Sequence, residues 1–148
     1  MRRGQYAAEV ITHFRDDVTL HTRRAFQAFF QTEEGEADFN PANTTLKTAN
    51  SRPLPGNTAG VQEYASAKEG VKATIKTLEG KGHGYERIIR RIKRNASAYE
   101  ICVAIIESDW GTGEAINEEK KYLLLEVLDD IKHGRQSLAT LEAREVAA

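Results

Sequence analysis

Hydrophobic residues recur at helical spacing along most of the chain. Apolar side chains three or four residues apart mark one face of an amphipathic helix. This pattern predicts six helices and one or two further turns, over about 5–14, 17–32, 66–78, 85–94, 96–106, 116–133 and 136–146. The alternating pattern of strands is nearly absent, so the sequence predicts a mainly α fold with at most a small hairpin.

The second predicted helix carries a broad apolar surface that includes Phe26, Phe29 and Phe30. Asp16 or Asp17 is the expected N-terminal cap of this helix, and Gly35 is the expected stop signal. We therefore expect residues 26–30 to be buried.

Residues 35–60 have a different composition from the rest of the chain. All three prolines (Pro41, Pro53 and Pro55) fall here, among Asn, Thr, Ser and Gly. This composition predicts a long irregular loop, with or without a short hairpin. Long loops inside compact domains are usually functional or disordered.

The bulk composition fits one globular domain. The chain has 148 residues, of which 40% are hydrophobic and 29% charged, and its formal net charge is −1. Such a balance gives no general attraction to nucleic acid or membranes. No run approaches the ~20 apolar residues of a membrane span, and the N-terminus lacks the apolar core of a secretory signal. If the protein acts outside the cell that makes it, something else is expected to carry it there.

Cysteine and histidine usage argues against several kinds of site. Cys102 is the single cysteine. It excludes an intrachain disulfide and a Cys-based zinc site, and its apolar neighbours predict a buried thiol. The four histidines show no metal-ligand spacing. Residues 80–84 are rich in glycine but lack the preceding strand and the ending of a phosphate loop.

A carboxylate at the end of the second helix is the strongest candidate for chemistry. Glu33 follows Phe29 and Phe30 within the last turn, where the helix dipole disfavours negative charge. An apolar setting there raises a carboxyl pKa and suits the group to act as a general acid. The structural alternative is a solvated acidic surface formed by Glu33, Glu34, Glu36 and Asp38.

The next segment, residues 39–45, reads Phe-Asn-Pro-Ala-Asn-Thr-Thr. Asn and Thr side chains on a loop constrained by proline can present donors and acceptors to sugar hydroxyls or amides. They can equally satisfy the backbone of their own loop. Both interpretations remain open from the sequence.

Taken together, these residues resemble a lysozyme-like domain found in endolysins and tail-associated proteins of phages that infect actinobacteria. That pattern has an aromatic residue and a Glu-Gly pair closing a helix, then Asn-Pro-x-Asn-Thr-Thr, Gly-Val-x-x-Tyr and Ser/Pro-Trp-Gly-Thr-Gly. The matches here, in the same order, are Phe29, Glu33, Asn40 to Thr45, Pro55-Gly56, Gly60 to Ser66, Gly70 to Thr74 and Ser108 to Gly113. The resemblance covers roughly residues 24–113. Residues 114–148 are expected to form a C-terminal helical extension of the same single domain, 1–148.

The resemblance implies a mainly α, lysozyme-like helical domain with a long irregular loop or small β-hairpin after the catalytic helix. It implies cleavage of peptidoglycan glycan strands, as a lysozyme or a lytic transglycosylase, with no cofactor and no metal. Glu33 falls on the catalytic acid of the family. The residues that it implies for substrate binding are Phe29, Asn40, Asn43, Thr44, Thr45, Tyr64 and Trp110. Two positions depart from the pattern, since Glu34 stands where glycine is usual and Phe29 where tryptophan is usual.

The step after acid catalysis stays open at this point. Ordinary hydrolysis uses a second carboxylate, for which Glu36, Asp38 and Glu63 are candidates. The alternative is attack by the 6-hydroxyl of the sugar itself, which is lytic transglycosylase chemistry. A phage enzyme of this kind is expected to be made in the cytoplasm and to reach the cell wall by phage delivery or lysis.

Two other functions compete with the enzyme. One is a non-catalytic virion structural or interaction protein on the same scaffold, whose partners would be other virion proteins. The other, ranked lowest, is nucleic-acid binding through the basic segment 81–94, which carries six Lys or Arg residues against one Glu. That segment can also be a solvated helix face, or it can attract an anionic wall polymer.

Overall fold

The computed structural model describes residues 1–110 and 118–147, apart from the side chains of 118–122. Within these residues the chain forms seven helices and one two-stranded antiparallel sheet, so the predicted mainly α fold with a small hairpin is confirmed. The elements are α1 (Arg3–Phe14), α2 (Leu20–Glu33), β1 (Arg52–Pro53), β2 (Gln62–Glu63), α3 (Ala67–Leu78), α4 (Tyr85–Lys93), α5 (Ala98–Ile106), α6 (Glu118–Lys132) and α7 (Leu138–Ala143).

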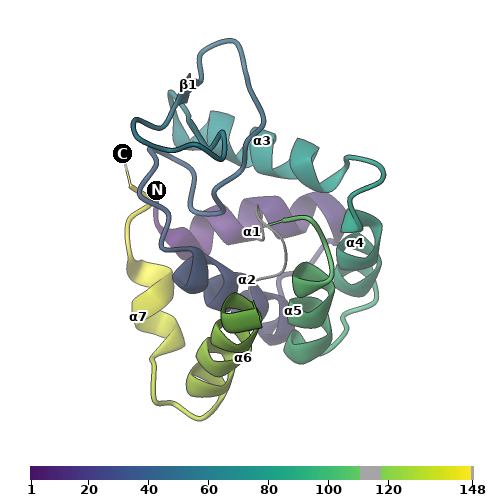
Figure 1. Ribbon diagram of the computed structural model, residues 1–148. Coiled ribbons are helices and arrows are strands. Elements are labelled where there is room, and N and C mark those ends of the chain that lie inside the picture. Colours follow the sequence, from purple (N-terminus) through teal and green to yellow (C-terminus); the bar gives the residue numbers. More distant parts are fainter. Residues whose placement is uncertain (111–117, 148) are drawn as a thin grey trace.

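Helix α2 lies at the centre of the arrangement, where it packs against α1, α5, α6 and α7 (Figure 1). Its residues 26–30 are all buried, as the apolar pattern predicted. One connected cluster of buried side chains draws on every helix, from Tyr6 in α1 to Leu141 in α7. The thiol of Cys102 is part of this core, also as predicted.

The two ends of α2 differ from the prediction. Its N-terminal cap is Thr19, whose hydroxyl accepts from the backbone N–H of Thr22, while the Thr22 hydroxyl accepts from the N–H of Thr19. This reciprocal capping box satisfies two helix-end groups at once, which one aspartate does not. Asp17 instead forms an ion pair with Arg15. At the other end, the left-handed residue is Glu34 (φ 44°) rather than Gly35.

Gly35 serves close packing instead of helix termination. A Cβ at this position would lie 2.7 Å from the carbonyl oxygen of Asn40 and 3.2 Å from the Cα of Pro41. The absence of a side chain therefore lets the loop after α2 fold back against the end of the helix.

That loop is held in shape by Asn40, which is fully buried. Its Nδ2 donates to the carbonyl oxygens of Thr44 (2.9 Å) and Gln62 (2.7 Å), and its Oδ1 accepts from the N–H of Thr44 (2.9 Å). The bond to Gln62 ties the loop to β2, which pairs with β1 in the register Arg52 opposite Glu63. Residues 35–60 thus form an irregular loop that leads into a short hairpin.

Helix α3 and the C-terminal segment fix the same loop from two other sides. Gly70 of α3 approaches so closely that a Cβ there would lie 2.0 Å from the carbonyl oxygen of Phe39. The N–H of Phe39 donates to the carbonyl oxygen of Ala147 (2.5 Å), and the two termini lie together (Figure 1). Residues after α7 also bond to the first residues of the chain, through Arg3 to Arg144 and Val146 to Met1. The C-terminal segment therefore supports the loop that follows α2.

Two further sequence predictions concern the helix before the C-terminal turn and the absence of a membrane span. The predicted helix 116–133 corresponds to α6, and its first residues lie outside the described part of the chain, as do Gly111, Thr112 and Gly113 of the predicted motif. Among the described residues, no helix is long and apolar enough to cross a membrane.

Candidate active site

A cleft of about 410 Å³ opens beside the C-terminal end of α2. Segments far apart in the sequence contribute to it: the end of α2, the loop after it, the hairpin, α3, the start of α4 and the residues before the undescribed segment. Its lining residues are Glu33, Asn43, Thr44, Thr45, Asn57, Ala59, Val61, Thr77, His83, Tyr85, Asp109 and Trp110.

Glu33 is the last residue of α2, and the loop fixes its carboxylate. The side-chain amide of Asn43 donates to Oε2 of Glu33 and to its backbone oxygen, each at 3.1 Å. Asn43 has a left-handed backbone (φ 52°), a conformation that Asn tolerates better than most residues. The cleft therefore contains a half-buried carboxylate in a defined orientation.

Trp110 forms an apolar wall of the cleft. Its side chain is almost fully buried, and its indole N–H donates to the carbonyl oxygen of Ala42 at 3.2 Å. The ring makes edge contacts with Phe29 (centroids 4.8 Å apart) and Tyr85 (6.0 Å). These contacts join the segment after α5 to α2, to the loop after α2 and to the start of α4.

The remaining residues of the predicted binding set lie behind the cleft. Phe29, Asn40 and Tyr64 are buried and are not among its lining residues. The Tyr64 hydroxyl bonds to Thr44 Oγ1 (2.7 Å) and to the carbonyl oxygen of Leu46 (2.7 Å), and burial raises the pKa of this phenol. The structure thus gathers Glu33, Asn43, Thr44, Thr45 and Trp110 at one surface, while the other three support that surface from inside.

The three acids that the sequence offered as a second carboxylate are not among the residues lining this cleft. Asp38 and Glu63 line a separate hollow of about 260 Å³, where Arg52 lies 2.7 Å from Glu63 and 3.7 Å from Asp38. Glu36 is exposed and lines neither space. A second acid for hydrolysis, if it comes from the described residues of the cleft, must be Asp109.

His83, Tyr85 and Asp109 are lining residues that the sequence did not single out for chemistry. Nδ1 of His83 lies 3.0 Å from Oδ2 of Asp109, and its ring stacks on Tyr85 with centroids 5.4 Å apart. Burial first, and then the charge of Asp109, raises the pKa of the Tyr85 hydroxyl. The position of Asp109 beside the Trp110 motif was the available signal, but nothing in the sequence paired it with His83.

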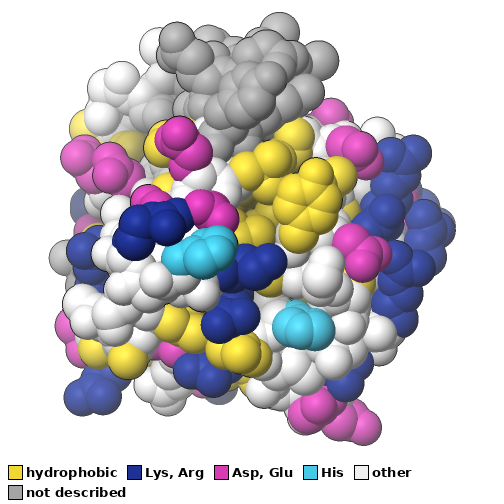
Figure 2. Space-filling view, turned by 90° about the horizontal axis from the view of Figure 1, so that it is seen from below, with side chains coloured by type: hydrophobic (Ala, Val, Ile, Leu, Met, Phe, Trp, Pro, Cys, Tyr) yellow, Lys and Arg dark blue, Asp and Glu magenta, His cyan; other side chains and the backbone are white. Residues whose placement is uncertain are grey.

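The basic segment 81–94 contains the whole of α4 and carries its charges outward. Figure 2 shows Lys and Arg side chains gathered along the edge where Figure 1 places α4 and α5, with acidic side chains beside them. Arg94 pairs with Glu100 (2.8 Å) and Arg87 with Glu107 (3.4 Å), both from α5 or its end. Ile88 and Ile92 are buried beneath. These ion pairs offset part of the positive charge and favour the solvated-face interpretation.

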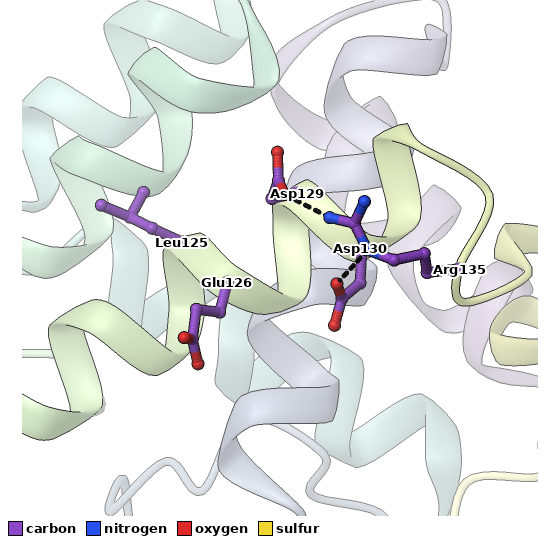
Figure 3. A pocket seen from close by; sticks show the side chains of 5 residues that line it. All are labelled: Leu125, Glu126, Asp129, Asp130 and Arg135. Carbon is purple, nitrogen blue, oxygen red and sulfur yellow. Dashed lines mark hydrogen bonds and ion pairs between the residues drawn. The ribbon is translucent and has the colours of Figure 1, made fainter.

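A second hollow, of about 530 Å³, lies along α6 and the turn after it (Figure 3). Its acids Asp129 and Asp130 both point to Arg135, which donates to Asp130 Oδ1 at 2.8 Å and also bonds to Asp129. Both carboxylates are already engaged in ion pairs with Arg135, and none of the residues that the sequence predicted for a site lines this hollow. We therefore assign the candidate site to the Glu33 cleft.

Comparisons with known proteins add no assignment, since no protein-family model, curated protein or solved structure matches this chain. Among the described residues, no group of three or more His, Cys, Asp or Glu side chains is placed to hold a metal ion.

Proposed function

We propose that this protein is a lysozyme-like enzyme that cleaves the glycan strands of peptidoglycan, with Glu33 as the general acid. Its place of action would be the bacterial cell wall, reached by phage delivery or lysis. The observation that carries the proposal is that Glu33, Asn43 to Thr45 and Trp110 line one cleft. These residues come from motifs more than sixty positions apart, and their order in the sequence did not require them to meet.

The cleft offers what acid-catalysed glycan cleavage needs on the leaving-group side. Glu33 stands at the end of a buried helix with its carboxyl oriented by Asn43. Protonated, it can donate to the glycosidic oxygen as the bond to C1 breaks. The exposed polar side chains of Thr45 and Asn57 can bond to sugar hydroxyls, while the buried Trp110 supports the wall of the cleft behind them. No cofactor is required for this chemistry.

Two routes complete the reaction, and both stay within the proposal. Water can attack C1, which gives a hydrolysed reducing end, or the 6-hydroxyl of the same sugar can attack, which gives an anhydro end. Either nucleophile must lose a proton.

The test is lysis of purified actinobacterial cell wall by the wild-type protein and by Glu33→Gln. The amide can still accept the Asn43 hydrogen bond but cannot donate a proton to the leaving oxygen. We expect the variant to bind wall and fold normally while its lysis rate falls about 10²- to 10⁴-fold, the usual worth of general-acid catalysis. Glu34→Gln is the matched control, because Glu34 is exposed and is not among the lining residues.

Two results would contradict the proposal. If Glu34→Gln abolished lysis while Glu33→Gln kept it, the general acid would be the neighbouring residue. If the wild-type protein lysed no wall, the enzyme would be replaced by the alternative, a virion structural or interaction protein built on the same scaffold.

A further inference from the structure

His83 and Asp109 form an ordered pair at the wall of the Glu33 cleft. Two bonds join their segments: Nδ1 of His83 lies 3.0 Å from Oδ2 of Asp109, and the backbone N–H of Asp109 donates to the carbonyl oxygen of His83 at 2.9 Å. The ring also stacks on Tyr85. The imidazole is therefore held between the Asp109 carboxylate and the Tyr85 ring, although its side chain is 53% exposed.

This arrangement determines which ring nitrogen is available. A carboxylate at Nδ1 holds the proton on that nitrogen, so the neutral ring carries its lone pair on Nε2. Within the described part of the chain, Nε2 of His83 has no hydrogen-bond partner. An aspartate that orients a histidine through Nδ1 and leaves Nε2 open is the arrangement of a general base.

We propose that His83, positioned by Asp109, is the general base that accepts the proton of the attacking hydroxyl in the reaction that Glu33 assists as an acid. This inference rests on the proposed function. It assigns the second proton transfer to a histidine instead of a second carboxylate, and it makes Asp109 a positioning residue. The hydroxyl belongs to water or to the sugar, and the base acts in the same way on both.

The proposed step balances without any further reactant. The Glu33 proton passes to the glycosidic oxygen, and the bond between that oxygen and C1 breaks with its electron pair leaving on the oxygen. The attacking oxygen forms the new bond to C1, and its proton passes to Nε2 of His83. The resulting imidazolium is stabilised by the Asp109 carboxylate, and proton exchange with solvent restores both groups.

The other titratable groups near His83 are few. Glu33 and Tyr85 line the same cleft, and Glu86 of α4 interacts electrostatically with His83 from outside it. The Glu86 carboxylate also accepts from the N–H of Gly82 (3.3 Å), so it faces the same turn. Among these groups, Asp109 alone contacts the ring nitrogen, so it is the residue that orients the imidazole.

The experiment measures kcat and KM for wall lysis against pH in the full-length wild type, His83→Ala and Asp109→Asn. We expect His83→Ala to lower kcat about 10²-fold or more with KM little changed, and to lose the acidic limb of the pH profile. We expect Asp109→Asn to lower kcat less, again with KM little changed, because the ring keeps its place but loses the partner that orients it. Circular dichroism and wall binding of each variant establish that the fold is kept.

The chain supplies a matched control in His133 and Asp129 of the α6 region. Nδ1 of His133 lies 3.1 Å from Oδ1 of Asp129, and both side chains are exposed outside the cleft. His133→Ala removes the same kind of pair and should leave both kcat and the pH profile unchanged.

The outcomes separate this inference from the proposed function. A wild type that lyses wall and a His83→Ala variant with unchanged kcat would overturn the base and leave Glu33 in place. A rise in KM alone would make His83 a sugar contact and would also overturn it. A wild-type protein without lysis would refute the proposed function itself, and the base with it.

Discussion

Glu34 adopts a left-handed backbone that glycine would adopt without strain. Its φ is 44° and its ψ 44°, and it follows the last residue of α2. Placing a side chain in this region costs roughly 1–2 kcal/mol, since Cβ crowds the next carbonyl. In the lysozyme-like pattern that the sequence resembles, this position is usually glycine, the residue that adopts a left-handed backbone without strain.

We predict that Glu34→Gly stabilises the protein by about 0.5–1 kcal/mol, the strain relieved less the entropy that glycine adds to the unfolded chain. Equilibrium unfolding in urea measures the change. Glu36→Gly is the control, because Glu36 is exposed and has no left-handed backbone. The Glu36→Gly variant should be less stable than the wild type. If Glu34→Gly lost stability to the same extent, residue 34 would bear no backbone strain.

Individual site residues were predictable where one segment contains both the residue and its signal. Glu33 lies at a helix end that apolar spacing locates, and Asn43 and Thr44 lie in the loop that follows. His83 and Asp109 could not be predicted as a pair, because 26 positions separate them and their contact depends on how α4 and α5 pack. Asn40 and Tyr64 have polar groups that suit a ligand, but folding directs them to the loop backbone and to Thr44.

At the scale of elements, the positions of the helices and of the loop with its small hairpin were predicted, but the cap of α2 and the packing of that loop were not. Apolar periodicity located α1 to α5 because each helix buries one face against α2 or a neighbour. The cap at Thr19 was missed because Ser, Thr, Asp and Asn all cap helices, and the choice depends on the reciprocal bond to Thr22. The shape of the loop after α2 depends on Gly35 and Gly70, which admit its backbone.

For Gly70→Ala, helix propensity predicts a gain in stability, whereas packing predicts a loss. Gly70 lies within α3, where propensity alone favours Gly70→Ala by about 1 kcal/mol. Because the new Cβ would meet the Phe39 carbonyl at 2.0 Å, we expect a loss of about 1–3 kcal/mol or more instead. Thermal or urea unfolding decides between them, with the exposed Lys72→Ala as the control in the same helix. A stabilised Gly70→Ala variant would show that the loop yields at no cost.

At the scale of the whole molecule, the burial of the Cys102 thiol and the Tyr6 phenol makes the protein less stable at alkaline pH. Burial raises the pKa of the Cys102 thiol from 9.0 to about 12, and it raises the pKa of Tyr6 as well. Well below pH 9 both groups are protonated in the folded and unfolded chains, so their contribution is fully present. As pH rises from 9 toward 12 the unfolded chain releases these protons first, and the free energy of unfolding falls.

We expect the free energy of unfolding to fall above pH 9 by up to ~1.4 kcal/mol per pH unit for each such group. Urea titrations between pH 7 and 11 measure this slope. Tyr6→Phe should make it shallower, whereas Tyr99→Phe, at a side chain that is 53% exposed, should not. A constant free energy up to pH 11 would mean that neither buried group is held protonated by the fold.

The most direct test of the central claim is to identify which bond of peptidoglycan the protein breaks. Purified peptidoglycan is digested with the wild-type protein and with Glu33→Gln, and the soluble products are identified by mass spectrometry. We expect disaccharide fragments with new sugar ends from the wild type, and none from Glu33→Gln. A hydrated reducing end would indicate a lysozyme and an anhydro end a lytic transglycosylase. Products cut only in the peptide stems, or no products at all, would contradict glycan cleavage by the Glu33 cleft.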